Sequence, residues 1–366
     1  MPPKTSETKK VREMTYTQAI REAFDIALEK DPQVFLIGEG IPDLKGAFGT
    51  TTGLQEKYGR HRVMDMPLSE NGLTGVCVGA ALAGMRPVLT HMRIEFSMLS
   101  MDQILNNASM WHYMFGGQQS VPIVIRGIIG RGWGQGPQHS QSLQAIFAHI
   151  PGIKVVMPVT PSDAKGLLLA AIFDNNPVIF IEHRWLHNIQ GPVPSGYYEI
   201  PIGKARMVKE GKDISVVATS HMVVESLQAA VLVKQTGVTV DLVDVRTIKP
   251  LDEQTICKSV EKTKRLLVVD AGWRTLGVAG DIVARVVERE FHVLKLAPRR
   301  ITLPDIAAPT SKVLAEQYYP NVADIATAIM EMTGVARKKQ ERIVESYNAL
   351  PHLPSDVPDN IFSGPF

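Results

Sequence analysis

Cysteine is scarce in this chain, with only Cys77 and Cys257 among its 366 residues. They lie far apart in the sequence, which argues against a disulfide framework and favours a reducing compartment such as the cytoplasm. The opening segment MPPKTSETKKVREM lacks an apolar core. We therefore expect no signal peptide and a flexible leader over residues 1–13, although an organellar protein that has lost its targeting segment would look the same.

Long apolar runs and an excess of one charge are also missing. The most membrane-like stretch, from Leu73 to Met85, is glycine-rich and shorter than the roughly 20 residues that span a bilayer. The formal net charge is only +2, which gives no reason to expect binding to nucleic acid. The composition therefore predicts a globular protein without a membrane or nucleic-acid partner.

Three common enzyme motifs are absent. In the glycine-rich loop RGIIGRGWGQGPQHSQ, a GxGxxG pattern started at Gly130 would place its last glycine at Gln135, so the dinucleotide fingerprint fails. The phosphate-binding pattern GxxxxGK[ST] and the nucleophile elbow GxSxG do not occur anywhere in the chain. Nucleotide hydrolysis and Ser–His–Asp hydrolysis therefore receive little support.

One pair of histidines has a spacing that metal sites use. His183 and His187 are four residues apart, and Glu182 is adjacent. They follow directly on a predicted strand, and the sequence offers no evident third ligand. A structural role is therefore the preferred interpretation over zinc binding.

Short apolar segments alternate with helical patterns throughout the first half of the chain. Fully apolar strands separated by helices are typical of a parallel sheet that is covered on both faces. A first helix is expected to begin near Thr15, with Gln18 at the spacing of a capping box. The predicted strands of the first half are VFLIG, RPVLTH, VPIVIR, IKVVMP and PVIFIE.

The alternation stops at HNIQGPVPSGYYEIPI, which is rich in proline and glycine and predicts a domain boundary. It then resumes with ISVVAT, VTVDLVDV and RLLVVD, and helical patterns join these strands. The fold class expected is therefore α/β, with two doubly wound domains. The final residues, ending SDVPDNIFSGPF, are expected to form an extended tail.

The glycine-rich loop is the first candidate for a site. It follows a predicted strand, and ligands of α/β folds bind at the carboxyl ends of parallel strands. Within one stretch the loop carries Arg126, Arg131, Trp133 and His139. Imidazole titrates near neutral pH, so His139 could move protons there.

Several stretches together resemble one enzyme family. They include PLSENGLTGVCVGAALAGMRPV, FSMLSMDQILNNAS, VPIVIRG, PQHSQS and HIPGIKVVMPVTPSDAKGLL, in this order. The chain resembles the β subunit of thiamine-diphosphate-dependent 2-oxo acid dehydrogenases, the E1 component of pyruvate, branched-chain and acetoin complexes. The resemblance runs from Met14 to about Val335.

The resemblance implies a division of the chain. A transketolase-like pyrimidine-binding domain is expected at residues 14–190 and a linker at 191–204. A domain of the transketolase C-terminal type is expected at 205–335, followed by the extended tail at 336–366.

The same resemblance implies site residues. Glu70 falls on the glutamate that contacts N1′ of the cofactor's aminopyrimidine, where a shared proton favours the imino tautomer. Met92 and Phe96 match residues that pack the ring, and His139 matches the active-site histidine. Glu39 matches an acidic residue near the subunit interface, on a proton path.

Further cofactors and partners are implied in the same way. A potassium site built largely from backbone carbonyls in some members falls on Ile123, Ala171, Ile172, Asp174 and Asn176. The GDG motif through which the family holds Mg²⁺ and the diphosphate is absent from this chain. The resemblance therefore implies a separate α subunit, an α2β2 heterotetramer, a 2-oxo acid substrate and a lipoyl acyltransferase (E2) partner.

The chain departs from the family pattern beside His139. Arg131 and Trp133 replace small residues, and with Arg126 they suggest a pocket for a larger or more polar 2-oxo acid, or an acceptor other than lipoamide. Ile94 and Glu95 also depart from the usual residues before Phe96. Two alternatives remain open: a non-oxidative thiamine-diphosphate decarboxylase or carboligase, and a non-catalytic structural paralogue.

Overall fold

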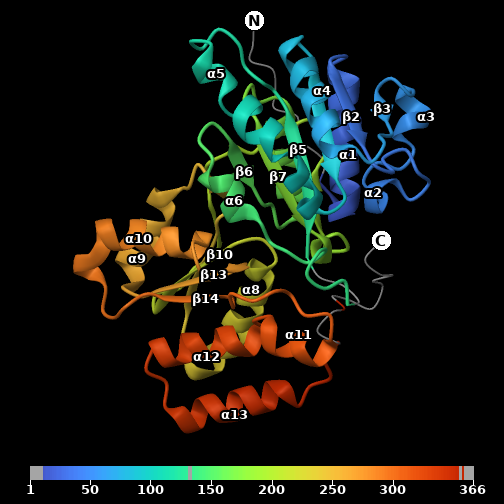
Figure 1. Cartoon of the computed structure of the whole chain (residues 1–366). Helices are drawn as coiled ribbons and strands as arrows, with labels where there is room; N and C mark the ends of the chain where they lie inside the picture. Colours follow the sequence, from blue (N-terminus) through green and yellow to red (C-terminus); the bar gives the residue numbers. More distant parts are fainter. Residues whose placement is uncertain (1–10, 131–133, 354–356, 358–366) are drawn as a thin grey trace, which may run out of the picture.

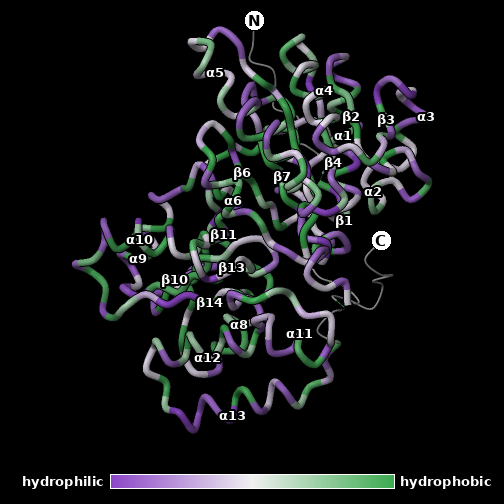
Figure 2. The backbone as a smooth tube through the Cα atoms, in the orientation of Figure 1, coloured by the Kyte–Doolittle hydropathy of each residue, from purple (hydrophilic) through white to green (hydrophobic). Residues whose placement is uncertain are grey.

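The computed structural model describes residues 11–130, 134–353 and 357. Two sheets, each flanked by helices, occupy the two halves of the molecule (Figure 1). The strands of both sheets are mostly hydrophobic in Figure 2, as strands with both faces covered must be. The predicted α/β class is confirmed.

The first sheet has seven strands in the order β12-β6-β7-β5-β4-β2-β3. All neighbours pair in parallel except β12 and β6, which are antiparallel. The five predicted strands are present. The strand bounds are β2 (Val34–Gly38), β3 (Val63–Met64), β4 (Arg86–His91), β5 (Val124–Ile129), β6 (Lys154–Val156), β7 (Val178–His183) and β12 (Thr247–Lys249).

Helices and short helical turns cover this sheet. The capping box is confirmed, because the Thr15 hydroxyl accepts the Gln18 N–H at 3.1 Å and the Gln18 side chain accepts the Thr15 N–H at 2.9 Å. The elements are α1 (Tyr16–Lys30), α2 (Gly46–Gly49), α3 (Leu54–Tyr58), α4 (Glu70–Leu82), η1 (Ile94–Ser100), η2 (Asp102–Ala108), α5 (Trp111–Met114), α6 (Gln144–His149), α7 (Pro161–Ile172) and η3 (Arg184–Leu186).

The second sheet has five strands in the order β14-β13-β10-β11-β9. Only the edge strand β9 is antiparallel to its neighbour. Its strands are β9 (Arg206–Lys209), β10 (Ile214–Ala218), β11 (Val240–Asp244), β13 (Leu266–Trp273) and β14 (Arg299–Leu303). Its helices are α8 (Met222–Val233), η4 (Lys234–Thr236), α9 (Glu253–Thr263), α10 (Val278–Glu290), η5 (Phe291–Val293), α11 (Lys312–Tyr318), α12 (Val322–Met332) and α13 (Arg337–Asn348).

The structure corrects the expected ends of the chain and the linker. β1 (Val11–Thr15) pairs antiparallel with β8 (Gln190–Pro194), so residues 11–13 belong to a strand and not to a leader. Residues 191–194 of the expected linker therefore belong to β8, the strand that pairs with β1. The strand β12 also crosses the expected boundary, since it comes from the second half of the chain and pairs in the first sheet.

The expected extended tail is also wrong over the length of α13. This helix buries Ile343 and packs Val344 and Tyr347 against the core, beside α12. Its remaining surface carries many hydrophilic residues (Figure 2), which concealed the narrow apolar face. Within the described ranges, no helix combines the length and apolar character needed to cross a membrane.

Candidate active site

Four parallel strands bring the candidate residues to one edge of the first sheet. The strands β7, β5, β4 and β2 are adjacent and parallel, so their carboxyl ends lie together. Glu39 follows β2, Met92 follows β4, and Gly130 begins the glycine-rich loop after β5. This edge is where parallel α/β sheets bind their ligands.

Two glutamates meet at this edge. Glu70 is the first residue of α4, where the positive end of the helix dipole favours a carboxylate, and it is only 9% exposed. Burial raises the pKa of Glu39, and the charges of Glu70 and Asp65 add to the effect. Within the described part of the chain, the Glu70 carboxylate has no hydrogen-bond partner. A largely buried carboxylate without a bonded partner is available to bind a ligand.

The segment from Met92 to Phe96 lies between these glutamates and the candidate histidine. A Cβ placed on Gly40 would lie 3.8 Å from Met92 Cε, so the Met92 methyl group covers the residue next to Glu39. Further along the segment, the Phe96 ring meets the His139 ring edge to face, with 5.5 Å between centroids. The structure thus places Met92 beside the residue next to Glu39 and Phe96 against His139, without assigning them a role.

His139 is partly exposed, and its surroundings disfavour the charged imidazolium. Burial lowers the pKa of His139, and the positive charge of Arg93 lowers it further. An imidazole that stays neutral near pH 7 can accept a proton or a hydrogen bond. Its position beside Phe96 therefore suits proton transfer at the sheet edge.

The structure contradicts the assignment of Arg126 to a substrate pocket. β5 continues to Ile129, so Arg126 lies inside the strand and is fully buried. Its guanidinium pairs with the Glu182 carboxylate and lies 5.6 Å from the centre of the Phe24 ring on α1. Arg126 is therefore part of the scaffold. Arg131 and Trp133, the other two predicted pocket residues, lie outside the described residues.

Glu182 joins Arg126 to His187 in a buried network. Burial alone would raise the pKa of Glu182, but the Arg126 charge and the hydrogen bonds from His187 and Arg126 lower it to about 2. His187 Nε2 lies 3.1 Å from Glu182 Oε2. This contact gives His187 a structural partner, and no group of three or more potential metal-ligating side chains occurs in the described residues.

The predicted potassium site lies around the turn after α7. Arg86 Nη1 donates to the Ile172 carbonyl at 3.1 Å and to the Asp174 carbonyl at 3.0 Å. The Asp174 carboxylate pairs with Lys154 and accepts the Asn176 amide at 3.0 Å. The carbonyls of this turn are thus clustered, with a guanidinium bound to two of them.

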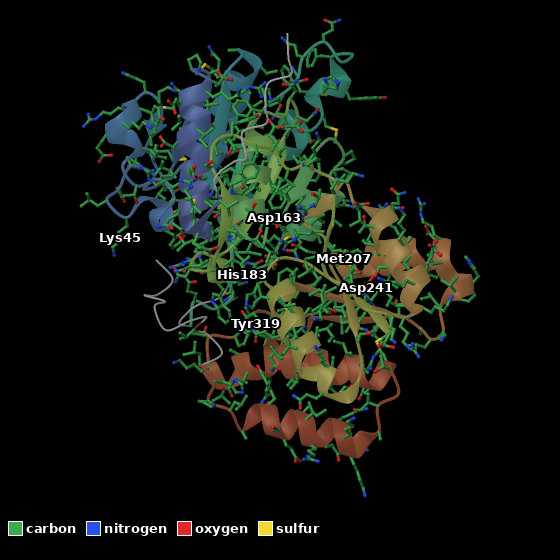
Figure 3. The ribbon with its side chains drawn as sticks, turned by 180° about the vertical axis from the view of Figure 1, so that it is seen from behind. Lys45, Asp163, His183, Met207, Asp241 and Tyr319 are labelled. Atoms are coloured by element: carbon green, nitrogen blue, oxygen red, sulfur yellow. The ribbon has the colours of Figure 1, made fainter. Side chains whose placement is uncertain are left out.

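A small cavity lies between the two halves of the molecule. It has a volume of about 30 Å³, enough for about two water molecules. Gly130 and Ser140 of the glycine-rich loop line one side, and His183 and Tyr319 line the junction with the second half (Figure 3). The cavity therefore adjoins the loop that carries His139 but is too small for an organic substrate.

Sequence reasoning missed Arg93. Its guanidinium is buried and donates to the Gly130 carbonyl, while Glu95 accepts the Gln141 N–H. The departure from the family pattern at Glu95 was the available signal, but a lone arginine forms no pattern by itself.

Family comparisons agree with this arrangement of two halves. The family model described as the transketolase pyrimidine binding domain matches residues 12–189, and the transketolase C-terminal domain matches residues 203–325. A solved structure described as a split-gene transketolase in an inactive β4 tetramer has a TM-score of 0.70 at 20% identity, and covers 88% of this chain and 99% of that chain. At this identity the likeness concerns the fold.

Curated relatives are more similar in sequence. The chain is 43% identical to the acetoin:2,6-dichlorophenolindophenol oxidoreductase subunit β of Cupriavidus necator, over 87% of this chain and 96% of the relative. It is 40% identical to the mitochondrial pyruvate dehydrogenase E1 component subunit β of Bos taurus, over 88% and 91%. The Bacillus subtilis acetoin:2,6-dichlorophenolindophenol oxidoreductase subunit β is 40% identical, over 88% and 98%.

The scaffold role of Arg126 predicts a loss of stability without a change of substrate preference. Arg126→Met leaves the buried Glu182 charge without its guanidinium partner, with only the contact to His187, and we expect it to lower the free energy of unfolding by about 3–5 kcal/mol. Urea denaturation measures the loss. Arg337→Met, which removes an exposed pair with Glu341, is the control and should change stability by less than about 1 kcal/mol. A stable Arg126→Met protein with altered substrate preference would return this residue to the pocket.

Proposed function

The chain belongs to the family of thiamine-diphosphate-dependent 2-oxo acid dehydrogenase E1 β subunits, and we propose that it forms the aminopyrimidine side of a decarboxylating site. Both transketolase-type modules and the relatives at 40–43% identity support this role. Decarboxylation of a 2-oxo acid followed by acyl transfer to a lipoyl group of an E2 partner is the proposed reaction.

The environment of Glu70 is the observation that carries the proposal. Bound thiamine diphosphate supplies the acidic carbon and the electron sink that decarboxylation requires. Glu70 would contact the aminopyrimidine N1′ and share a proton with it, as the resemblance implies. Its carboxylate is available for this contact because it is largely buried beside Glu39 and has no hydrogen-bond partner in the described residues. Met92 and Phe96 would pack the ring, because both are half-buried apolar side chains at the same sheet edge.

His139 would act on the substrate side. Its lowered pKa favours a neutral imidazole, which can take up a proton or donate one to the acyl acceptor as the reaction proceeds. Glu39, whose pKa is raised by burial and by its acidic neighbours, would extend a proton path from Glu70.

We propose that a separate α subunit completes the site in an α2β2 heterotetramer. The sequence contains no GDG motif, so Mg²⁺ and the diphosphate would be held mainly by α. Exposed apolar side chains on α4, on the neighbouring η1, on α5 and directly after α5 offer a surface for such a partner. They are Val76, Leu99, Tyr113, Met114 and Phe115.

Acetoin is a second candidate substrate. Two of the relatives are named as acetoin oxidoreductase subunits, and one of them is 43% identical.

The reducing, cytoplasmic compartment stays a prediction, supported by the buried and unpaired Cys77 and Cys257.

Substitution of Glu70 tests the reaction. With the α partner, Mg²⁺ and thiamine diphosphate, we expect Glu70→Gln to lower turnover about 10²- to 10⁴-fold, as for a general acid–base group. A panel of 2-oxo acids and acetoin is assayed by CO₂ release and by dye reduction. Dye reduction without CO₂ release identifies acetoin as the substrate, and CO₂ release without transfer to an acceptor identifies a non-oxidative decarboxylase.

Glu56→Gln is the matched control, because Glu56 is exposed on α3, away from the sheet edge. It should retain wild-type turnover. Equal turnover of Glu70→Gln and wild type would disprove the role of Glu70.

Potassium binding is a separate proposal for Ile123, Ala171, Ile172, Asp174 and Asn176. The clustered carbonyls of the turn after α7 support it, since each carbonyl oxygen bound to Arg86 keeps a second lone pair. At equal ionic strength, KCl should raise the melting temperature of the protein above the value in choline chloride. Asp174→Asn is expected to reduce this difference, and equal melting temperatures in the two salts would exclude a stabilising potassium site.

A further inference from the structure

Arg93 carries a buried charge that the proposed reaction does not use. It lies between β4 and η1 and is 2% exposed, and a buried guanidinium is costly unless it is bonded. Nη1 donates to the Gly130 carbonyl at 2.7 Å, and Nη2 donates to the Gln135 side-chain oxygen. Both acceptors precede His139 on the glycine-rich loop. Arg93 therefore fixes the part of this loop that precedes His139.

Glu95, two residues after Arg93, fixes the part of the same loop that follows His139. Its Oε1 accepts the backbone N–H of Gln141 at 2.6 Å. The Gln141 side chain in turn donates to the Pro137 carbonyl at 3.0 Å. The chain is therefore fixed both before and after His139 by two side chains of one short segment.

The segment that carries these two side chains is itself fixed. Ile94, between them, is buried, and a Cβ on Gly127 of β5 would lie 2.9 Å from Ile94 Cγ1. The segment thus packs directly on the strand that precedes the loop. Phe96, the next residue after Glu95, contacts the His139 ring. Residues 93–96 therefore contact the loop before and after His139 and also contact the His139 ring.

The charges around His139 are asymmetric. Burial lowers the pKa of Arg93 to about 10, so Arg93 stays positive at neutral pH. Among the described charged groups, Arg93 is the one whose charge acts on His139. Glu95 faces Arg93, and burial raises its pKa. His91, at the end of β4, is kept uncharged because burial lowers its pKa to about 4.

We propose that Arg93 and Glu95 are positioning residues that clamp the loop on both sides of His139. The clamp sets the position of the imidazole, and the positive charge of Arg93 adds to the effect of burial on its protonation. The importance of both for turnover rests on the proposed function of His139, but the clamp itself is a property of this chain.

The reactivity of His139 toward diethyl pyrocarbonate tests the charge. This reagent acylates uncharged imidazole, so the rate of modification against pH gives the midpoint of protonation, and peptide mass spectrometry resolves each histidine. In the complex with the α subunit, Arg93→Met should move the midpoint of His139 to higher pH. His149, exposed at the end of α6, is the internal control and should not move.

Arg93→Lys separates charge from position. A lysine keeps the positive charge but cannot reproduce the fork that binds two acceptors. We expect its His139 midpoint to stay near the wild-type value while kcat falls about 10- to 100-fold, as for a displaced catalytic group. Wild-type kcat in Arg93→Lys would overturn the clamp, and an unchanged midpoint in Arg93→Met would overturn the role of the charge.

Two further variants keep the test decisive if Arg93→Met fails to assemble. Gln135→Leu removes one acceptor and leaves the charge, so kcat should fall without a shift of the His139 midpoint. Glu95→Gln keeps an acceptor for the Gln141 N–H and should retain more activity than Glu95→Ala. Unchanged kcat in Gln135→Leu, or equal losses in the two Glu95 variants, would contradict the clamp.

Arg62→Met is the matched control for loss of a guanidinium. Arg62 donates to the carbonyls of Leu28, Asp31 and Val34, away from the loop, so its loss should reduce stability and leave the His139 midpoint unchanged. The modification experiment needs no substrate. It reports on Arg93 even if no 2-oxo acid is decarboxylated, so failure of this inference and failure of the proposed function remain distinguishable.

Discussion

The parallel alignment of β2, β4, β5 and β7 is the constraint on which the candidate site depends. Their registers, such as His91 opposite Gly127 and Ile129 opposite His183, make the strands end at one edge of the sheet. Segments that are far apart in the sequence therefore meet there. The buried pair of Arg126 on β5 and Glu182 on β7 bonds two of these strands to each other, so the scaffold and the site share the same strands.

The charged side chains at this edge of the sheet fall into two groups. Those with hydrogen-bonded partners support the structure, and those without are available to a ligand. Glu182 is buried and fully engaged, with both oxygens bonded to Arg126 or His187. Glu70 is almost as buried but has no bonded partner in the described residues, which leaves its carboxylate for a ligand. His187 and His139 differ in the same way, because one imidazole is fixed by a carboxylate and the other is partly exposed beside a positive charge.

Sequence patterns predicted the features that follow from local periodicity. The strands were predicted because burial of both faces requires continuous apolar runs in the sequence. The capping box at Thr15 was predicted because a hydroxyl at the first turn, three residues before Gln18, is visible in the sequence. Arg126 was misassigned because an arginine after an apolar run was interpreted as the end of the strand, whereas β5 continues to Ile129 and buries it. β12 is three residues long, too short for a periodic signal, and the many charges of α13 hid its apolar face. Arg93 depends on contacts with residues about 40 positions away, which no local pattern records.

Binding of thiamine diphosphate by the two subunits tests the central claim, that this chain supplies one half of a shared site. Calorimetric titration in the presence of Mg²⁺ is performed on the β chain alone and on the complex with its α partner. We predict tight, stoichiometric binding by the complex and none of comparable affinity by β alone, because the sequence of this chain has no GDG motif for Mg²⁺ and the diphosphate, which the α subunit is proposed to hold. Tight stoichiometric binding by the isolated β chain would contradict it.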